Sequence, residues 1–175
     1  NHCALRQQGD ARRIYFYGAG SAPLMVWNGS ALQVCVWGPG GLVAVHDGTL
    51  RYPVNDYQQS IWAVFDDAGN AQHAFDYAPF GALLSSAVLS SAVSSSAGSG
   101  DWNLLFAGKE YDADSGLYDF GARLYDPSLM RFLAPDAARQ FASPYLFASD
   151  NPLNYVDPTG NISLWAQVGI GVAMV

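Results

Sequence analysis

Carboxylates gather in the last third of the chain, where they could support acid–base chemistry. Asp136 stands out because it ends the run RFLAPD, whose apolar residues would strip water from its carboxylate. A desolvated carboxylate near a second one can share a proton with it, so that one acts as a base on water and the other as an acid. An arginine nearby would keep one carboxylate ionised or orient the carbonyl of a peptide bond to be cut. The aspartates of this region are Asp112, Asp114, Asp119, Asp126, Asp136, Asp150 and Asp157.

Turn formation explains most of these aspartates more simply than catalysis does. The pairs Asp126-Pro127 and Asp157-Pro158 are typical of turn initiators, because an Asp side chain bonds the backbone two residues on. Asp126 and Asp157 are therefore weaker catalytic candidates than Asp136.

Other chemistries find no support in the sequence. His2, His46 and His73 are isolated, and neither Cys3 nor Cys35 lies at a ligand spacing from them, so we expect no metal site. Neither a G-x-S-x-G elbow nor a phosphate-binding glycine loop occurs, and we expect no cofactor. Both cysteines are predicted to be buried thiols, with a Cys3–Cys35 disulfide as the alternative in an oxidising compartment.

The composition favours an ordered chain that buries its faces against neighbouring units. Of the 175 residues, 50% are hydrophobic and 14% aromatic, whereas 13% are charged, about half the usual share. The net charge is −7, and the eight Lys and Arg residues form no basic stripe, which argues against nucleic acid as a partner. The chain begins at Asn1 with no apolar leader behind a positive charge, so we expect a piece of a longer protein.

Short strands separated by turns must position these residues. From Arg13 onward, runs of four to seven residues rich in Val, Tyr, Trp and Phe end in Gly, Pro, Asn or Asp, which predicts strands and turns. The runs are RIYFY, APLMVWN, LQVCVWG and LVAVHDG, the last followed by TLRYPVND; a further pair, at 60–65 and 72–77, is joined by a turn at 66–70. The predicted fold class is all-β, a meander of antiparallel hairpins.

Two blocks of the sequence resemble a known family. The stretch VNDYQQSIWAVFDDAGNAQHAFDYAPFG resembles the Rhs or YD (tyrosine–aspartate) repeat, and residues 106–160 resemble the Rhs repeat-associated core. We therefore expect a linker at 1–12, hairpin repeats at 13–82, a Ser/Ala-rich loop at 83–102, the core at 103–160 and the start of a variable C-terminal region at 161–175. A short helix over Ala82–Val93 is the alternative for part of the loop.

The resemblance implies both an architecture and an activity. It implies a hollow β-shell, closed here by a small irregular plug with short helical turns near 134–141 and 145–149. In such shells, including the C component of insecticidal toxin complexes, the core works as an aspartic-type self-protease that frees a C-terminal toxin after a D-P-x-G element. Matched by motif, the arginine is Arg123, the aspartate is Asp136, D-P-x-G is Asp157–Gly160, and the bond to be cut is Asn161–Ile162.

This chain departs from the family pattern near that bond. Asn161 stands where cleaved members usually have Leu, and Met130, Leu124 and Ala137 replace a usual Gly, Tyr and Pro. The alternative is that the core only locks the closing turns, with Arg123 paired to Asp126 or Asp136. The sequence leaves open whether the chain is an enzyme.

The expected partners follow from the same resemblance. They are the preceding YD repeats and the C-terminal toxin domain of the same chain, together with secretion-system or delivery proteins, for a secreted or cell-surface parent protein. The other hypothesis is a non-catalytic cell-surface module for adhesion or carbohydrate contact, using the five Trp and ten Tyr. The uncharged run from Ile162 to Val175 is too short for a membrane span and is predicted to be a buried strand or helix, with membrane contact left open.

The low charge also predicts how the segment behaves alone. Repeats of this kind bury their faces against neighbours, so residues 1–175 expressed by themselves should lack part of their core. We expect aggregation or rapid proteolysis, and a sharp cooperative melt of a soluble monomer would contradict this.

Overall fold

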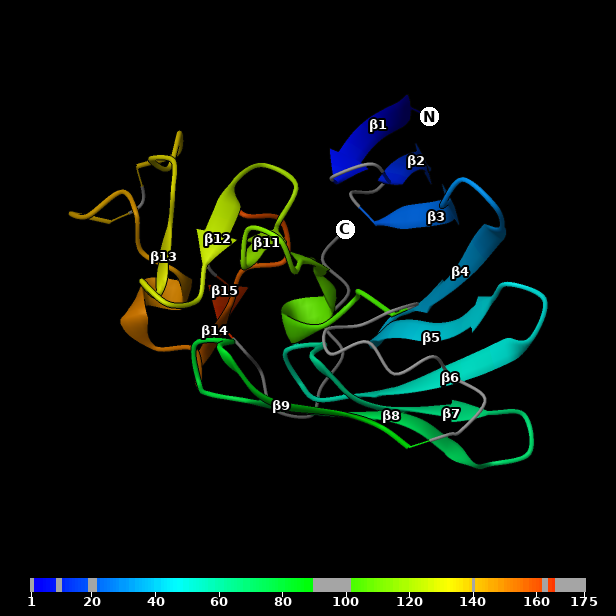
Figure 1. The fold of residues 1–175 in the computed structure, drawn as a ribbon. Coiled ribbons are helices and arrows are strands. Elements are labelled where there is room, and N and C mark those ends of the chain that lie inside the picture. The colour runs from blue at the N-terminus through cyan, green and yellow to red at the C-terminus, as the bar shows by residue number, and fades with distance from the viewer. Residues whose placement is uncertain are drawn as a thin grey trace.

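The computed structural model describes residues 2–8, 11–18, 22–89, 102–139, 141–161 and 164–165. The fold is all-β, as predicted. Nine antiparallel strands form one sheet in which each strand pairs with the next along the chain, and they follow one another along a curved wall (Figure 1). These strands are β1 (His2–Gln8), β2 (Ala11–Tyr17), β3 (Pro23–Trp27), β4 (Leu32–Gly38), β5 (Gly41–His46), β6 (Leu50–Asn55), β7 (Ile61–Asp66), β8 (Ala71–Tyr77) and β9 (Leu83–Val88).

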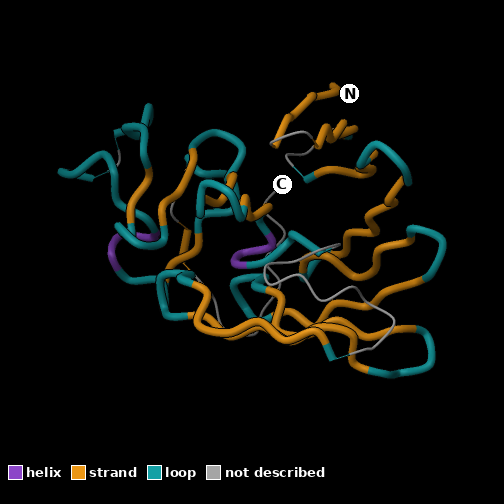
Figure 2. Tube along the Cα trace, in the orientation of Figure 1, coloured by secondary structure: helices purple, strands orange, loops and turns teal. Residues whose placement is uncertain are grey.

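Two smaller sheets follow the wall in the described part of the chain. A four-stranded sheet runs β10-β11-β12-β13, and β14 pairs with β15. Their bounds are β10 (Glu110–Asp112), β11 (Leu117–Asp119), β12 (Leu124–Asp126), β13 (Arg131–Phe132), β14 (Tyr155–Val156) and β15 (Leu164–Trp165). The described helical segments are two three-residue 3-10 turns, η1 (Phe106–Gly108) and η2 (Ala148–Asp150), drawn purple in Figure 2. Neither of these described turns is long enough to cross a membrane.

Three segments differ from the sequence prediction. Most of the expected linker at 1–12 is strand, since β1 and the start of β2 pair in register from His2–Tyr17 to Gln8–Ala11. Part of the expected Ser/Ala loop is strand β9, so a helix over Ala82–Val93 is wrong there, while residues 90–101 lie outside the described ones. The segment TLRYPVND, for which no strand was predicted from the sequence, contains strand β6.

Strand β6 was hidden by its proline. A Pro cannot donate to a sheet ladder and is normally confined to edges. Here the β5–β6 pairing stops at Arg51, two residues before Pro53, while β6 pairs with β7 from Arg51 to Asn55. Pro53 is therefore tolerated because β6 has only one ladder partner at that point.

The Tyr-Asp dipeptides explain how the small sheet is built. In each of the three successive strands β10, β11 and β12, the Tyr side chain packs in or against the hydrophobic core, and the following Asp ends the strand in a turn. Tyr118 and Tyr125 are fully buried, and their hydroxyls donate to the carbonyls of Gly81 (3.0 Å) and Phe80 (2.7 Å). The Asp side chains accept backbone N–H groups two residues on, as in the bond from Ser128 to Asp126 (2.8 Å). Each Tyr-Asp dipeptide thus combines a residue of the hydrophobic core with a residue that forms a turn.

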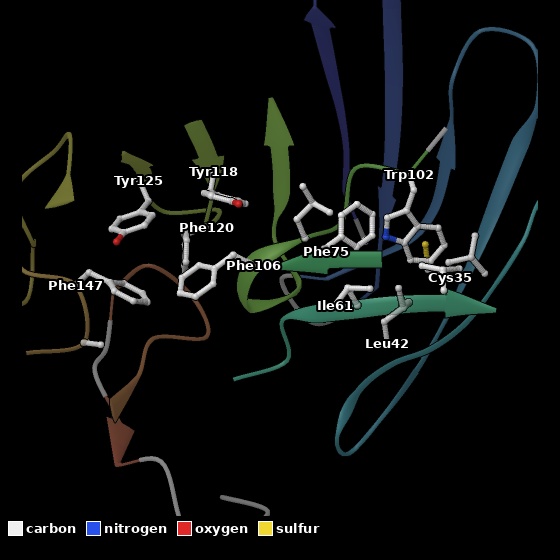
Figure 3. Close-up of a cluster of buried hydrophobic side chains, with 14 of the residues drawn as sticks. Cys35, Leu42, Ile61, Phe75, Trp102, Phe106, Tyr118, Phe120, Tyr125 and Phe147 are labelled. Atoms are coloured by element: carbon white, nitrogen blue, oxygen red, sulfur yellow. The ribbon is translucent and has the colours of Figure 1, made fainter. Parts of the chain in front are cut away.

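Aromatic side chains join the small sheet to the wall. Phe106, in η1, lies 5.9 Å from Tyr118 and 6.0 Å from Tyr77 between ring centroids, so it bridges the two sheets. Figure 3 shows Phe106 between the rings of the small sheet and the residues of the wall. The buried cluster comprises Cys35, Leu42, Val45, Ile61, Val64, Phe75, Trp102, Leu105, Phe106, Tyr118, Phe120, Tyr125, Phe132, Phe147 and Ala148.

Cys35 belongs to this cluster as a free thiol. Burial raises the pKa of its thiol to about 11, which keeps it protonated and unreactive. A disulfide with Cys3 is wrong, because β1 and β4 are three strands apart, roughly 14 Å, whereas disulfide-bonded Cα atoms lie within about 7 Å.

The expected helical turns are only partly present. Residues 134–139 contain turns and bends but no helix. Near 145–149, the turn is η2, and its residues Ala148, Ser149 and Asp150 all have positive φ, between 47° and 57°. A run of three non-glycine residues in the left-handed region is strained, by roughly 1–2 kcal/mol for each. The buried Ser149 Oγ also has no hydrogen-bond partner among the described residues.

Replacing Ser149 by Gly should stabilise the region around η2 by about 1 kcal/mol, because it relieves left-handed strain and removes an unpaired hydroxyl. Hydrogen exchange of peptides covering 141–161, measured in the full-length protein, would report the change. The matched control is Ser128→Gly, because Ser128 bonds Asp126 at an exposed turn and its replacement should be mildly destabilising. Faster exchange in Ser149→Gly would contradict the strain argument.

Candidate functional site

Arg123 is the centre of the region that the sequence predicts to be functional. It follows the turn after β11 and precedes β12, and its side chain is 5% exposed. The guanidinium Nε donates to the Gly160 carbonyl, Nη1 to the Pro144 carbonyl (3.2 Å) and Nη2 to the Asp157 carboxylate (3.4 Å). Its carbon Cζ lies 3.7 Å from the centre of the Phe132 ring. All of its donating nitrogens are thus engaged, which suits the planar fork of arginine.

Asp157 anchors the D-P-T-G element. Its Oδ1 accepts the N–H groups of Thr159 (3.2 Å) and Gly160 (2.8 Å), and its Oδ2 faces Arg123. Gly160 has φ +76°, and a Cβ there would come within 2.9 Å of Phe120 Cβ, so only glycine fits this close turn. The N–H and the C=O of Gly160 are consequently held by opposite charges, Asp157 and Arg123.

Asp136 lies close to the same centre. It is 6% exposed, and its Oδ1 accepts the N–H of Ala138 (2.8 Å). Its own N–H donates to the Pro144 carbonyl (2.7 Å), which also accepts from Arg123. Burial lowers the pKa of Arg123, while the Asp157 and Asp136 carboxylates act in the opposite direction. Arg123 therefore lies within electrostatic reach of both aspartates and stays charged.

Lys109 also contacts the D-P-T-G element. Its Nζ donates to the Pro158 carbonyl and lies 5.4 Å from the centre of the Phe120 ring. Burial lowers the pKa of Lys109, and the carboxylates of Asp157 and Asp119 oppose that shift. Two cations, Lys109 and Arg123, thus hold successive parts of the D-P-T-G backbone.

This geometry favours a structural role, in which Arg123 and Asp157 fix Gly160 in place; we call this arrangement the lock. It also offers one route to cleavage. The Arg123 guanidinium forms an ion pair with the Asp157 carboxylate, whereas an aspartic dyad consists of two carboxyl groups that share one proton. The same arginine polarises the Gly160 carbonyl, as an oxyanion donor would. That carbonyl belongs to the Gly160–Asn161 bond, one residue before the predicted Asn161–Ile162 bond. Asn161 is exposed, and Ile162 lies outside the described residues.

The sequence candidates divide into two groups. The structure brings together Arg123, Asp157, Gly160 and, through Pro144, Asp136. Asp126 instead accepts the N–H groups of Ser128 and Leu129 at an exposed turn and forms no ion pair with Arg123 within the described chain.

Two members of the centre could not be singled out from the sequence. Lys109 has no signal beyond being a lysine inside the F-A-G-K-E-Y-D run of the core block. Pro144 acts through a main-chain carbonyl, which no motif reveals.

Neither His46 nor His73 takes part in this centre. His73 is buried in β8 and stacks on Phe75 at 5.9 Å between ring centroids, while His46 is exposed at the end of β5. Among the described residues, no group of three His, Cys, Asp or Glu side chains could hold a metal ion.

Solved structures of Tc toxin complexes share this fold. The chain aligns with a crystal structure of TcdB2-TccC3 at a TM-score of 0.67 and 21% identity, covering 90% of this chain and 8% of that one. It also aligns with a Photorhabdus luminescens Tc holotoxin pore carrying a TccC3 substitution, at a TM-score of 0.57 and 17% identity, covering 94% and 9%. The chain therefore has a fold related to that of these toxin components.

A curated protein is similar in sequence. Salivary gland surface protein 1 of Aedes aegypti is 32% identical over 130 residues, which is 74% of this chain and 4% of that protein. The chain thus spans about 4% of the length of this relative. No family model matches the chain.

Proposed function

We propose that this segment is the closing part of an Rhs-type β-shell, its residues 103–160 being the Rhs repeat-associated core. The observation that carries the proposal is the pair of hydrogen bonds that fix Gly160: its carbonyl accepts from Arg123, and its N–H donates to Asp157. These two bonds fix Gly160 next to the small sheet, at the point from which the chain continues toward its C-terminus. The related fold of Tc toxin components supports a shell role.

The partners follow from this placement. The outer edge of β1 has no neighbouring strand among the described residues, and an unpaired edge is a template for another strand. Preceding YD repeats of the same chain would pair there. A C-terminal toxin domain would begin beyond the D-P-T-G lock, and the parent protein would be secreted or surface-exposed, handled by delivery proteins.

The segment would also release its cargo by cutting itself once. In this step Asp136 takes a proton from water, and the hydroxide adds to the carbonyl carbon of Gly160, whose oxygen Arg123 already binds. Arg123 stabilises the resulting oxyanion. The C–N bond then breaks, and the leaving nitrogen takes the proton that Asp136 removed from water, yielding a carboxyl group and a free amine.

The intact mass of the full-length protein tests self-cleavage. We expect two fragments whose masses place the cut after Gly160 or Asn161, and a single uncut chain for Asp136→Asn. Asp112→Asn is the matched control, because both aspartates accept a turn N–H that an Asn oxygen also accepts, so it should be cut normally. If the unmutated protein remains uncut, self-cleavage is refuted and the Arg123 centre has only the structural role of fixing Gly160.

A second candidate is a non-catalytic surface module. The observation that favours it is the likeness to a protein named for the surface of a salivary gland. In that function the Arg123–Asp157 pair would only close the fold. An uncut protein located on the cell surface would support this candidate against the first.

A further inference from the structure

The turn between β3 and β4 carries a motif that has no part in the lock. Asn28-Gly29-Ser30 is an N-x-S triplet, the sequence at which a glycan is attached to an asparagine side chain in secreted proteins. All three residues are exposed. Figure 1 shows this turn at the rim of the wall, on the side away from the small sheet. A bulky group attached there would therefore extend into solvent and leave the core and the lock undisturbed.

Hydrogen bonds within the turn fix the amide of Asn28. Its Oδ1 accepts the N–H groups of Ser30 (3.1 Å) and Ala31 (2.8 Å). The same oxygen accepts the hydroxyl of Ser30 (3.1 Å), the group that the triplet requires. Within the described residues the Nδ2 of Asn28 donates no hydrogen bond. The atom that would carry the glycan is thus the unengaged end of an oriented, exposed amide.

Two large apolar side chains flank the turn without cover. Trp27 and Leu32 are partners across β3 and β4, and they are 37% and 47% exposed. The C–H face of a sugar ring packs on the face of an aromatic ring. The first sugar of a glycan on Asn28 would lie one residue from Trp27 and would shield this pair from water.

We propose that Asn28 is a glycosylation site, modified at Nδ2 by a lipid-linked oligosaccharide diphosphate. In the transfer, Nδ2 loses a proton to a base of the transferase and forms a bond to C1 of the first sugar. The bond between C1 and the diphosphate oxygen breaks, and the lipid diphosphate leaves. The inference rests on the proposed function in one respect, that the parent protein is secreted or surface-exposed, and it does not depend on self-cleavage.

The chain contains a second N-x-S triplet, at 161–163, to which the inference does not extend. Ile162 and Ser163 lie outside the described residues, so no geometry supports an acceptor there. The two triplets are easily separated by experiment. Trypsin cuts after Arg13 and Arg51 and yields a peptide, 14–51, in which Asn28 is the sole asparagine.

Peptide mass spectrometry of the full-length protein tests the site. The protein is produced in insect cells behind an added secretory leader and recovered from the medium and from the secretory membranes. We expect the peptide 14–51 to carry a glycan, whose removal by peptide-N-glycosidase converts Asn28 to Asp. Asn28→Gln and Ser30→Ala should each abolish the glycan on this peptide, whereas Ser30→Thr should retain it because threonine also supplies the hydroxyl.

Asn70→Gln is the matched control. Asn70 is also exposed at a hairpin turn, but Ala71 and Gln72 follow it, and its Nδ2 donates to Asp66 (3.1 Å). The peptide 14–51 of this variant should carry the same glycan as that of the unmutated protein. An unmodified peptide 14–51 in the unmutated protein would overturn the inference, as would a glycan that persists on it in Asn28→Gln.

Protein produced without the added leader separates this inference from the proposed function. If it stays inside the cell, the proposed location is refuted, and the natural modification of Asn28 is refuted with it. If it reaches the surface or the medium with a bare Asn28, the inference alone is overturned. The masses of the fragments cut near Gly160 report self-cleavage independently of both results.

Discussion

Replacing Arg123 by Met should destabilise the small sheet by about 3–5 kcal/mol, because it removes one partner of a buried ion pair and leaves the Asp157 carboxylate buried without the guanidinium. The side chains of Arg123 and Asp157 are 5% and 1% exposed, so water cannot replace the lost partner. The Gly160 and Pro144 carbonyls lose their donors at the same time. Met has a similar length, so the loss of charge rather than of volume dominates.

Hydrogen exchange of peptides covering 117–126 and 155–161, in the full-length protein, measures this loss as a free energy of opening. Arg131→Met is the matched control: Arg131 pairs with Asp150 at 3.8 Å, but both side chains are about half exposed. A surface pair of that kind contributes about 0–1 kcal/mol. Equal effects of the two substitutions would show that the Arg123 centre is not a lock.

Arg123→Lys separates charge from geometry. A lysine keeps the positive charge but cannot donate to three acceptors in one plane. We expect it to recover only part of the stability lost in Arg123→Met. Full recovery would mean that charge alone holds Asp157.

The sequence predicted the strands well where side chains alternate. In β4, a run predicted as a strand, side chains alternate between two faces: Cys35 is buried, whereas Leu32, Val34 and Val36 are exposed. The turn at 66–70 is also confirmed, since the Asp66 carboxylate accepts the N–H groups of Ala68 and Asn70. Both features depend on neighbours a few residues apart, which a sequence displays directly.

The sequence singled out Arg123, Asp136, Asp157 and Gly160 as candidates, but it did not indicate which of them contact one another. The sequence singled out Arg123 and offered Asp126 or Asp136 as its ion-pair partner. The structure pairs it with Asp157, 34 residues away, because the D-P-T-G turn folds back onto the start of β12. Backbone acceptors such as the Pro144 carbonyl carry no residue type, so no motif could indicate them. A turn near 145–149 was predicted, but the left-handed backbone of η2 was not, since non-glycine residues rarely adopt positive φ.

The larger packing effect is expected at Gly81, which should not tolerate alanine. Gly81 follows the Y-x-P-F run before β9, has φ +84°, and a Cβ there would lie 2.4 Å from Phe106 Cδ1. Phe106 cannot retreat, because it contacts Tyr77, Tyr118 and Phe147. The Gly81 carbonyl also accepts the Tyr118 hydroxyl, so displacement of the loop would break a buried hydrogen bond.

Gly69→Ala isolates the packing term. Gly69 has the same φ, +84°, but nothing lies within 4 Å of the position that a Cβ would take there, so alanine adds only left-handed strain of about 1–2 kcal/mol. Gly81→Ala adds to that strain an overpacking cost of about 1–3 kcal/mol. Urea-dependent hydrogen exchange of peptides covering 102–120 in the full-length protein would compare the two.

If both glycine substitutions cost the same, the contact between Gly81 and Phe106 is looser than the structure indicates. A greater loss at Gly81 would instead show that the wall and the small sheet are coupled through Phe106. The lock at Gly160 would then depend on the wall, because Phe120 packs against both Gly160 and the rings around Phe106. Gly81→Ala should accordingly speed exchange at 155–161 as well, whereas Gly69→Ala should leave that segment protected.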